Sequence, residues 1–174
     1  GGLAGRADGV IEDVSVSGTV LSGSSYTGGS IGYASGATLH RVSADVTVQG
    51  TNRTGGLVGY LYSGSEMQHA YATGSVQGTT QVGGLVGQVY WGPTISDSYS
   101  RASVSGADDV GGLVGYLQSG SVYRSYSTGP VSGTVETAGG LIGRSGGAVS
   151  DAYWDTQTSG QNTSAGGEGR ITAQ

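Results

Sequence analysis

A short glycine-rich motif recurs along this chain of 174 residues at an almost constant spacing. The steps between successive copies are 27, 27, 28, 28 and 28 residues. Such a period is the signature of a repeat architecture, in which each unit buries its apolar face against its neighbours. We therefore expect one domain over residues 1–174, built from six units. Paired glycines mark their starts at Gly1, Gly28, Gly55, Gly83, Gly111 and Gly139.

Within each unit, side chains alternate between a small or apolar kind and a polar or aromatic kind. In the third unit Met67, Ala70 and Ala72 belong to the first kind, and Tyr71 and Thr73 to the second. Period two is typical of a strand with one buried face, and no helical period is present. The sequence predicts an all-β parallel β-solenoid (β-helix) of about six coils with ~28 residues each, stacked ~4.8 Å apart. We expect it to be right-handed, as parallel crossovers generally are.

The glycines of GGLVG indicate sharp turns and close approach between coils. Leu57 and Val58 are neighbours in this motif, so strict alternation would bury only one of them. The Val column is never polar, which favours Val inside. Tyr60, two residues later, belongs to an outer row, which favours Leu inside. We expect Leu57 to face the core and Val58 and Tyr60 to form an exposed apolar strip.

Tyrosine recurs at one outward position of the strands. Because these tyrosines share parity with a column that carries Asp and Arg, burying them would bury charges too. The predicted result is an aromatic ladder beside Arg101, which could bind sugar rings. The alternative is that stacked aromatics simply stabilise the sheet, by ~0.2–1 kcal/mol per pair. The ladder residues are Tyr71, Tyr99, Tyr126 and Tyr153.

The motif GGLVG followed by a strand of the type SYSTGPVSG resembles the GLUG repeats of large bacterial surface and secreted proteins. These include filamentous-haemagglutinin-like adhesins and immunoglobulin-A-peptidase-like proteins. The four units from Gly55 onward match well and the first two match loosely. The resemblance implies an extracellular, cell-surface segment with a structural or adhesive role, and it supplies no catalytic residue.

The twelve acidic residues form no obvious catalytic pair or metal site. Asp97 and Asp151 share a column with Arg124 between them, so we interpret that column as a charge ladder between coils. His40 and His69 lie in successive coils, but we expect no shared metal. We predict no catalytic residue, metal or cofactor. A polysaccharide-degrading β-helix enzyme and an ice-binding face remain minor alternatives.

Composition limits the partners. The chain carries a net charge of −5, its seven basic residues are all Arg, and it has no Cys. Without a basic run we expect no nucleic-acid partner, and without a long apolar segment no membrane insertion. The chain opens in mid-pattern, so we expect it to be part of a longer polypeptide.

The irregular end differs from the repeats. Trp154 replaces a small inward residue, and residues 154–174 leave the pattern. A solenoid end must cover its open core, so we predict that this segment is a C-terminal cap. The overall interpretation is a non-catalytic spacer and display surface on a bacterial cell, meeting a host or neighbouring cell surface or its glycans. The alternative is a carbohydrate-binding module that uses the tyrosine ladder.

Overall fold

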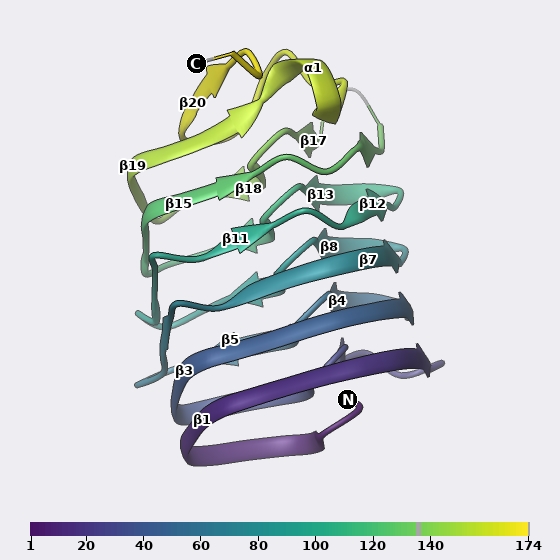
Figure 1. Ribbon diagram of the computed structural model, residues 1–174, viewed down its shortest axis with the longest axis vertical. Coiled ribbons are helices and arrows are strands. Elements are labelled where there is room, and N and C mark those ends of the chain that lie inside the picture. Colours follow the sequence, from purple (N-terminus) through teal and green to yellow (C-terminus); the bar gives the residue numbers. More distant parts are fainter. Residues whose placement is uncertain (135–136, 174) are drawn as a thin grey trace.

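The computed structural model describes residues 1–134 and 137–173 and confirms the predicted fold class. The chain winds into parallel coils of about 28 residues that stack from the N-terminus to the C-terminus (Figure 1). Five complete turns are followed by an incomplete sixth. The register joins the first glycine of each motif to its equivalent one coil away, as in the pairs Gly28 with Gly55 and Gly55 with Gly83.

A large sheet forms two walls of the solenoid. In the first two coils one long strand spans both walls, and in later coils it is divided at the corner. The strands of this sheet are β1 (Ala4–Leu21), β3 (Ile31–Gln49), β5 (Val58–Tyr62), β6 (Glu66–Gln68), β7 (Tyr71–Gln77), β9 (Val86–Val89), β10 (Thr94–Ser96), β11 (Tyr99–Ser100), β12 (Ser103–Ser105), β14 (Val114–Leu117), β15 (Ser121–Ser127), β16 (Val131–Ser132), β18 (Ile142–Ser145) and β19 (Ala148–Asp155), together with β20 (Glu168–Arg170).

A smaller sheet closes each turn. Its five parallel strands end at the first glycine of the following motif, so the chain bends there to begin the next coil. They are β2 (Thr27–Gly28), β4 (Asn52–Gly55), β8 (Thr80–Gly83), β13 (Asp108–Gly111) and β17 (Ala138–Gly139).

The thin core is filled by ladders of Leu, Val, Ala and Ser. Leu57 and Val58 are both fully buried, so the expectation of an exposed strip that includes Val58 is wrong. Leu57 lies in the bend between β4 and β5 and belongs to neither strand, so alternation does not apply across it. Buried Ser98 donates to the carbonyl of Ser96 at 2.6 Å, which satisfies its hydroxyl within the core.

The last coil is covered by the end of the chain. Trp154 is 6% exposed, and its indole nitrogen donates to the carbonyl of Gln161 at 3.0 Å. The helix α1 (Thr156–Ser159) follows, and β20 pairs with β19. Figure 1 shows α1 and β20 lying on the final coil. Gln174, the last residue of the expected cap, is outside the described residues.

Candidate functional site

The four ladder tyrosines lie on the outer face of successive coils, where the alternation predicted them. The rings of Tyr71 and Tyr99 are 5.0 Å apart between centroids with 3° between their planes. Those of Tyr99 and Tyr126 are 5.0 Å apart with 6° between planes. Tyr153 follows Tyr126 in register, and Tyr71 is 37% exposed.

The ladder uses much of its aromatic surface on itself. Parallel rings at this separation overlap, so each pair turns part of a face toward its neighbour rather than toward solvent. The guanidinium of Arg101 lies 5.2 Å from the Tyr99 centroid and donates to the Tyr126 hydroxyl at 3.5 Å. Burial raises the pKa of the Tyr99 hydroxyl. What remains for a ligand along these three coils is the exposed part of each ring beside Arg101.

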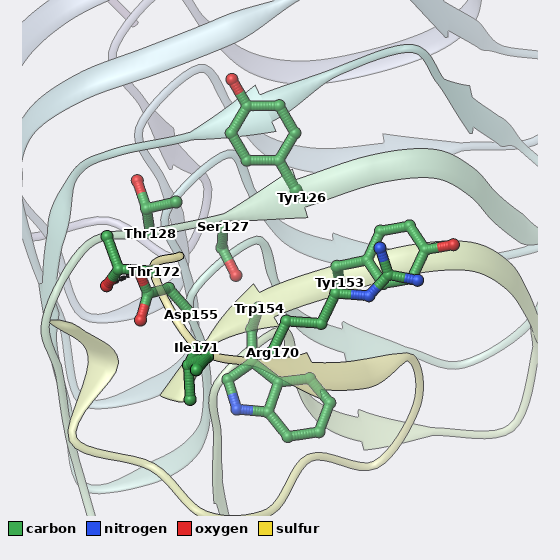
Figure 2. Close-up of a pocket in the computed structure, with 9 residues that line it drawn as sticks. All are labelled: Tyr126, Ser127, Thr128, Tyr153, Trp154, Asp155, Arg170, Ile171 and Thr172. Atoms are coloured by element: carbon green, nitrogen blue, oxygen red, sulfur yellow. Dashed lines mark hydrogen bonds between the residues drawn. The ribbon is translucent and has the colours of Figure 1, made fainter. Parts of the chain in front are cut away.

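A pocket lies at the C-terminal end of the ladder (Figure 2). Arg170 covers the Tyr153 ring at 3.5 Å from its centroid, so this ring is occupied by the protein's own cation. Thr172 donates to the carboxylate of Asp155 at 2.7 Å, and this bond lowers the pKa of Asp155. The lining residues are Tyr126, Ser127, Thr128, Tyr153, Trp154, Asp155, Arg170, Ile171 and Thr172.

A second group of aromatic residues, which we call the aromatic patch, was not predicted as a site. Its six rings form one continuous series of contacts with centroid separations from 5.5 Å (Tyr26 to Tyr60) to 6.1 Å (Tyr62 to Tyr90). Of these residues, the sequence predicted an outward position for Tyr60, which is half-buried, and Trp91 is 62% exposed. The aromatic patch consists of Tyr26, Tyr33, Tyr60, Tyr62, Tyr90 and Trp91.

Two arginines lie on the aromatic patch. Arg53 is 5.2 Å from the Tyr26 centroid and 5.3 Å from the Tyr60 centroid, and its Nε donates to the side-chain oxygen of Gln88. Arg6 is 5.3 Å from the Tyr33 centroid. Burial among these rings raises the pKa of Tyr60 to about 12. The patch therefore combines exposed rings with fixed positive charge.

The predicted charge ladder is present as two ion pairs between coils. Arg41 donates to Asp13 at 2.8 Å, and Arg124 donates to both carboxylate oxygens of Asp97 at 2.7 Å. The hydrogen bonds from Arg124 hold the pKa of Asp97 well below its usual range, and Arg41 lowers that of Asp13. These contacts tie coils together and leave little free charge in the column.

His40 and His69, which lie in successive coils, are in contact. The rings of His40 and His69 are 5.3 Å apart, and Nδ1 of His40 lies 3.7 Å from Glu12. Within residues 1–134 and 137–173, no group of three or more His, Asp or Glu side chains is placed to hold a metal ion. In the same part of the chain, no helix is both long and apolar enough to cross a bilayer.

The fold and these surfaces define the protein as a parallel β-solenoid built from glycine-rich repeats. The family model described as the GLUG motif matches residues 1–21 and 50–77. A search of curated proteins and a search of solved structures each found no match. The first matched range lies within the first unit, and the second runs from the end of the second unit through most of the third, which contains the opening copy of GGLVG.

Proposed function

We propose that this chain is a non-catalytic structural segment that acts as a rigid spacer in an extracellular or cell-surface bacterial protein and takes part in adhesion. The main observation behind this proposal is the regular parallel pairing between adjacent coils. Equivalent residues such as Thr47 and Ser75 face each other in adjacent coils, and parallel strand pairing joins successive coils of the described chain. A stack in which every coil is hydrogen-bonded to the next resists bending more than a string of separate domains does.

The adhesive part of this proposal draws its support from the GLUG match and from the exposed aromatic surface. Its expected partners are a host or neighbouring cell surface, glycans on that surface, and the rest of its own polypeptide. It requires no cofactor. Labelling intact cells with antibodies to this segment tests the location. Absence of labelling on intact cells, with labelling after lysis, would overturn it.

Carbohydrate binding by the tyrosine ladder is the second candidate function. The observation in its favour is the outward, aligned position of Tyr71, Tyr99 and Tyr126, with Arg101 alongside. The mutual overlap of the rings counts against it, because sugars lie on open aromatic faces. A glycan array with Tyr99→Ala and Tyr126→Ala separates the two functions. Binding that both variants lose would favour the ladder over the pure spacer.

The spacer function is tested by measuring a distance along the solenoid. The chain has no Cys, so two introduced thiols carry spin labels at unique places. Ser17 and Thr128 occupy the same outer column four coils apart. A rigid stack places their Cα atoms about 19 Å apart, at ~4.8 Å per coil. Double electron–electron resonance should give one narrow distance distribution for Ser17→Cys/Thr128→Cys. The same sample unfolded in urea provides a broad distance distribution for comparison.

A broad distribution in native buffer would contradict the rigid spacer. The labelled sites both lie on the outer face, so the labels should not disturb the core. The circular dichroism of the labelled variant checks this.

A further inference from the structure

The aromatic patch contains two rings that are more exposed than Tyr71, the most exposed ring of the ladder. Tyr26 is 43% exposed and Trp91 is 62% exposed, although both lie within a packed cluster. The planes within the patch meet at angles from 14° between Tyr26 and Tyr60 to 67° between Tyr26 and Tyr33. Each ring has one stacked partner, and the pairs are Tyr26 with Tyr60, Tyr33 with Tyr62 and Tyr90 with Trp91. Because Trp91 is largely exposed despite its stacked partner, the patch presents apolar ring surface to solvent there.

The backbone at Trp91 is strained, which indicates that this residue has a role in binding and not in packing alone. Trp91 has φ of 64° and Gly92 has φ of 87°, so two consecutive residues lie in the left-handed region. Turns with this backbone strongly prefer Asn-Gly. A bulky side chain at the first of these positions is an outlier, and such strain gathers at binding sites. An Asn at this position would give a more stable turn, but it would lack the exposed indole ring that Trp91 supplies.

The arginines of the patch lack acidic partners. Among residues 1–134 and 137–173, neither Arg6 nor Arg53 lies within ion-pair distance of a carboxylate, whereas Arg41 and Arg124 each do. Arg53 uses one of its five N–H donors on Gln88. Its remaining donors sit beside Tyr26 and Tyr60, where an incoming anion would meet both a cation and an aromatic face. The chain is acidic overall, so this local positive charge stands out.

We propose that the aromatic patch binds an acidic polysaccharide that contains uronate sugars. The apolar face of a pyranose ring lies on Trp91, and the carboxylates of the chain pair with Arg53 and Arg6. This site is separate from the tyrosine ladder and does not depend on the spacer function.

Two variants remove the proposed contacts without removing the fold. Trp91→Asn creates the Asn-Gly pair that the turn prefers, so its melting temperature should equal or exceed that of the wild type. Arg53→Gln introduces the residue that occupies the equivalent position of the next coil, where Gln81 has φ of 55° against 49° for Arg53. Tyr116→Ala is the matched control, because it removes a ring that lies under Arg144 but belongs to neither the aromatic patch nor the ladder.

Isothermal titration calorimetry with a galacturonate hexamer, and with cellohexaose as the neutral counterpart, tests the proposal. We expect the wild type to bind the uronate and not the neutral sugar. Trp91→Asn and Arg53→Gln should each weaken binding about tenfold or more, the effect of losing a charge-assisted or stacking contact. Tyr116→Ala should bind as the wild type does. Absence of uronate binding, equal binding of cellohexaose, or full affinity in both variants would each overturn the proposal.

Discussion

At the scale of the single residue, one left-handed position explains an irregularity in the repeat. The inward columns that begin with Ile11 and Val14 are three residues apart, which strict period two does not allow. The structure resolves this at Asp13, whose φ of 54° turns the chain between two walls. The equivalent residue in every coil has a positive φ as well. These residues are Asp13, Arg41, His69, Asp97, Arg124 and Asp151.

The ion pair between Asp97 and Arg124 should make the free energy of unfolding depend on pH. Arg124 depresses the pKa of Asp97 in the folded state, so the pair stabilises the fold above the unfolded carboxyl value near ~4. That contribution should shrink as the pH falls from there toward the depressed folded pKa. We expect the melting temperature of Arg124→Gln to lie below that of the wild type at pH 7 and to converge with it in acid.

Thermal unfolding followed by circular dichroism from pH 7 to strong acid gives this comparison. Thr73→Ser, which keeps the hydroxyl that donates to Asp45, is a control on the same wall. A constant difference between wild type and Arg124→Gln across the whole pH range would contradict the role of Asp97.

At the scale of the element, the motif GGLVG requires glycine because there is no room for a Cβ atom at these positions. A Cβ at Gly55 would lie 2.1 Å from the carbonyl oxygen of Val58, and one at Gly56 would lie 2.1 Å from that of Gly84. The first contact is within a turn and the second is between coils, which are the two roles predicted for these glycines. Backbone atoms cannot rotate away as a side chain can, so the motif must recur.

The last glycine of the motif gives a matched pair of variants. A Cβ at Gly87 would lie 2.5 Å from the carbonyl carbon of Arg53 and 2.6 Å from the nitrogen of Thr54. Gly5 holds the same motif position in the first coil, with nothing within 4 Å. We expect Gly87→Ala to destabilise the protein by ~3 kcal/mol or more, and Gly5→Ala to stabilise it by ~0.4–1 kcal/mol.

Urea denaturation of both variants measures these changes. Near-equal midpoints for Gly87→Ala and Gly5→Ala would mean that coil-to-coil crowding is not the reason for the glycine. Should Gly87→Ala fail to accumulate as folded protein, Gly5→Ala still tests the other half of the argument.

The sequence predicted features that depend on spacing and missed those that depend on side chains crossing between elements. The coil length, the outward Tyr71 and the ion pair between Asp97 and Arg124 follow from columns of equivalent residues. The aromatic patch joins residues from different columns, since Tyr26 precedes the short strand β2 and Trp91 lies in a turn between β9 and β10. Periodicity placed Tyr60 in an outer row, but only the fold brings the other columns of the patch beside it.

At the scale of the whole molecule, the two ends of the solenoid differ. The last coil is covered by Trp154, α1 and β20, whereas within residues 1–134 and 137–173 β1 pairs with β3 alone and its other edge is unpaired (Figure 1). Val14 and Val16 are half-buried at that open end, while Val42 and Ala44 one coil above are fully buried. A long strand with one unpaired edge, next to a core that is not covered, is a template for pairing with another strand.

We therefore expect residues 1–174, prepared alone, to associate through β1 as concentration rises. Val16→Lys should suppress this, because its inward ammonium would be buried without a partner only when another chain covers the end. Ser17→Lys adds the same charge to the adjacent outward position and should leave association unchanged. Sedimentation velocity over a range of concentrations distinguishes the three proteins. Association that Val16→Lys and Ser17→Lys reduce equally would instead point to the outer face, and a wild type that stays monomeric throughout would show that the open edge of β1 is not adhesive.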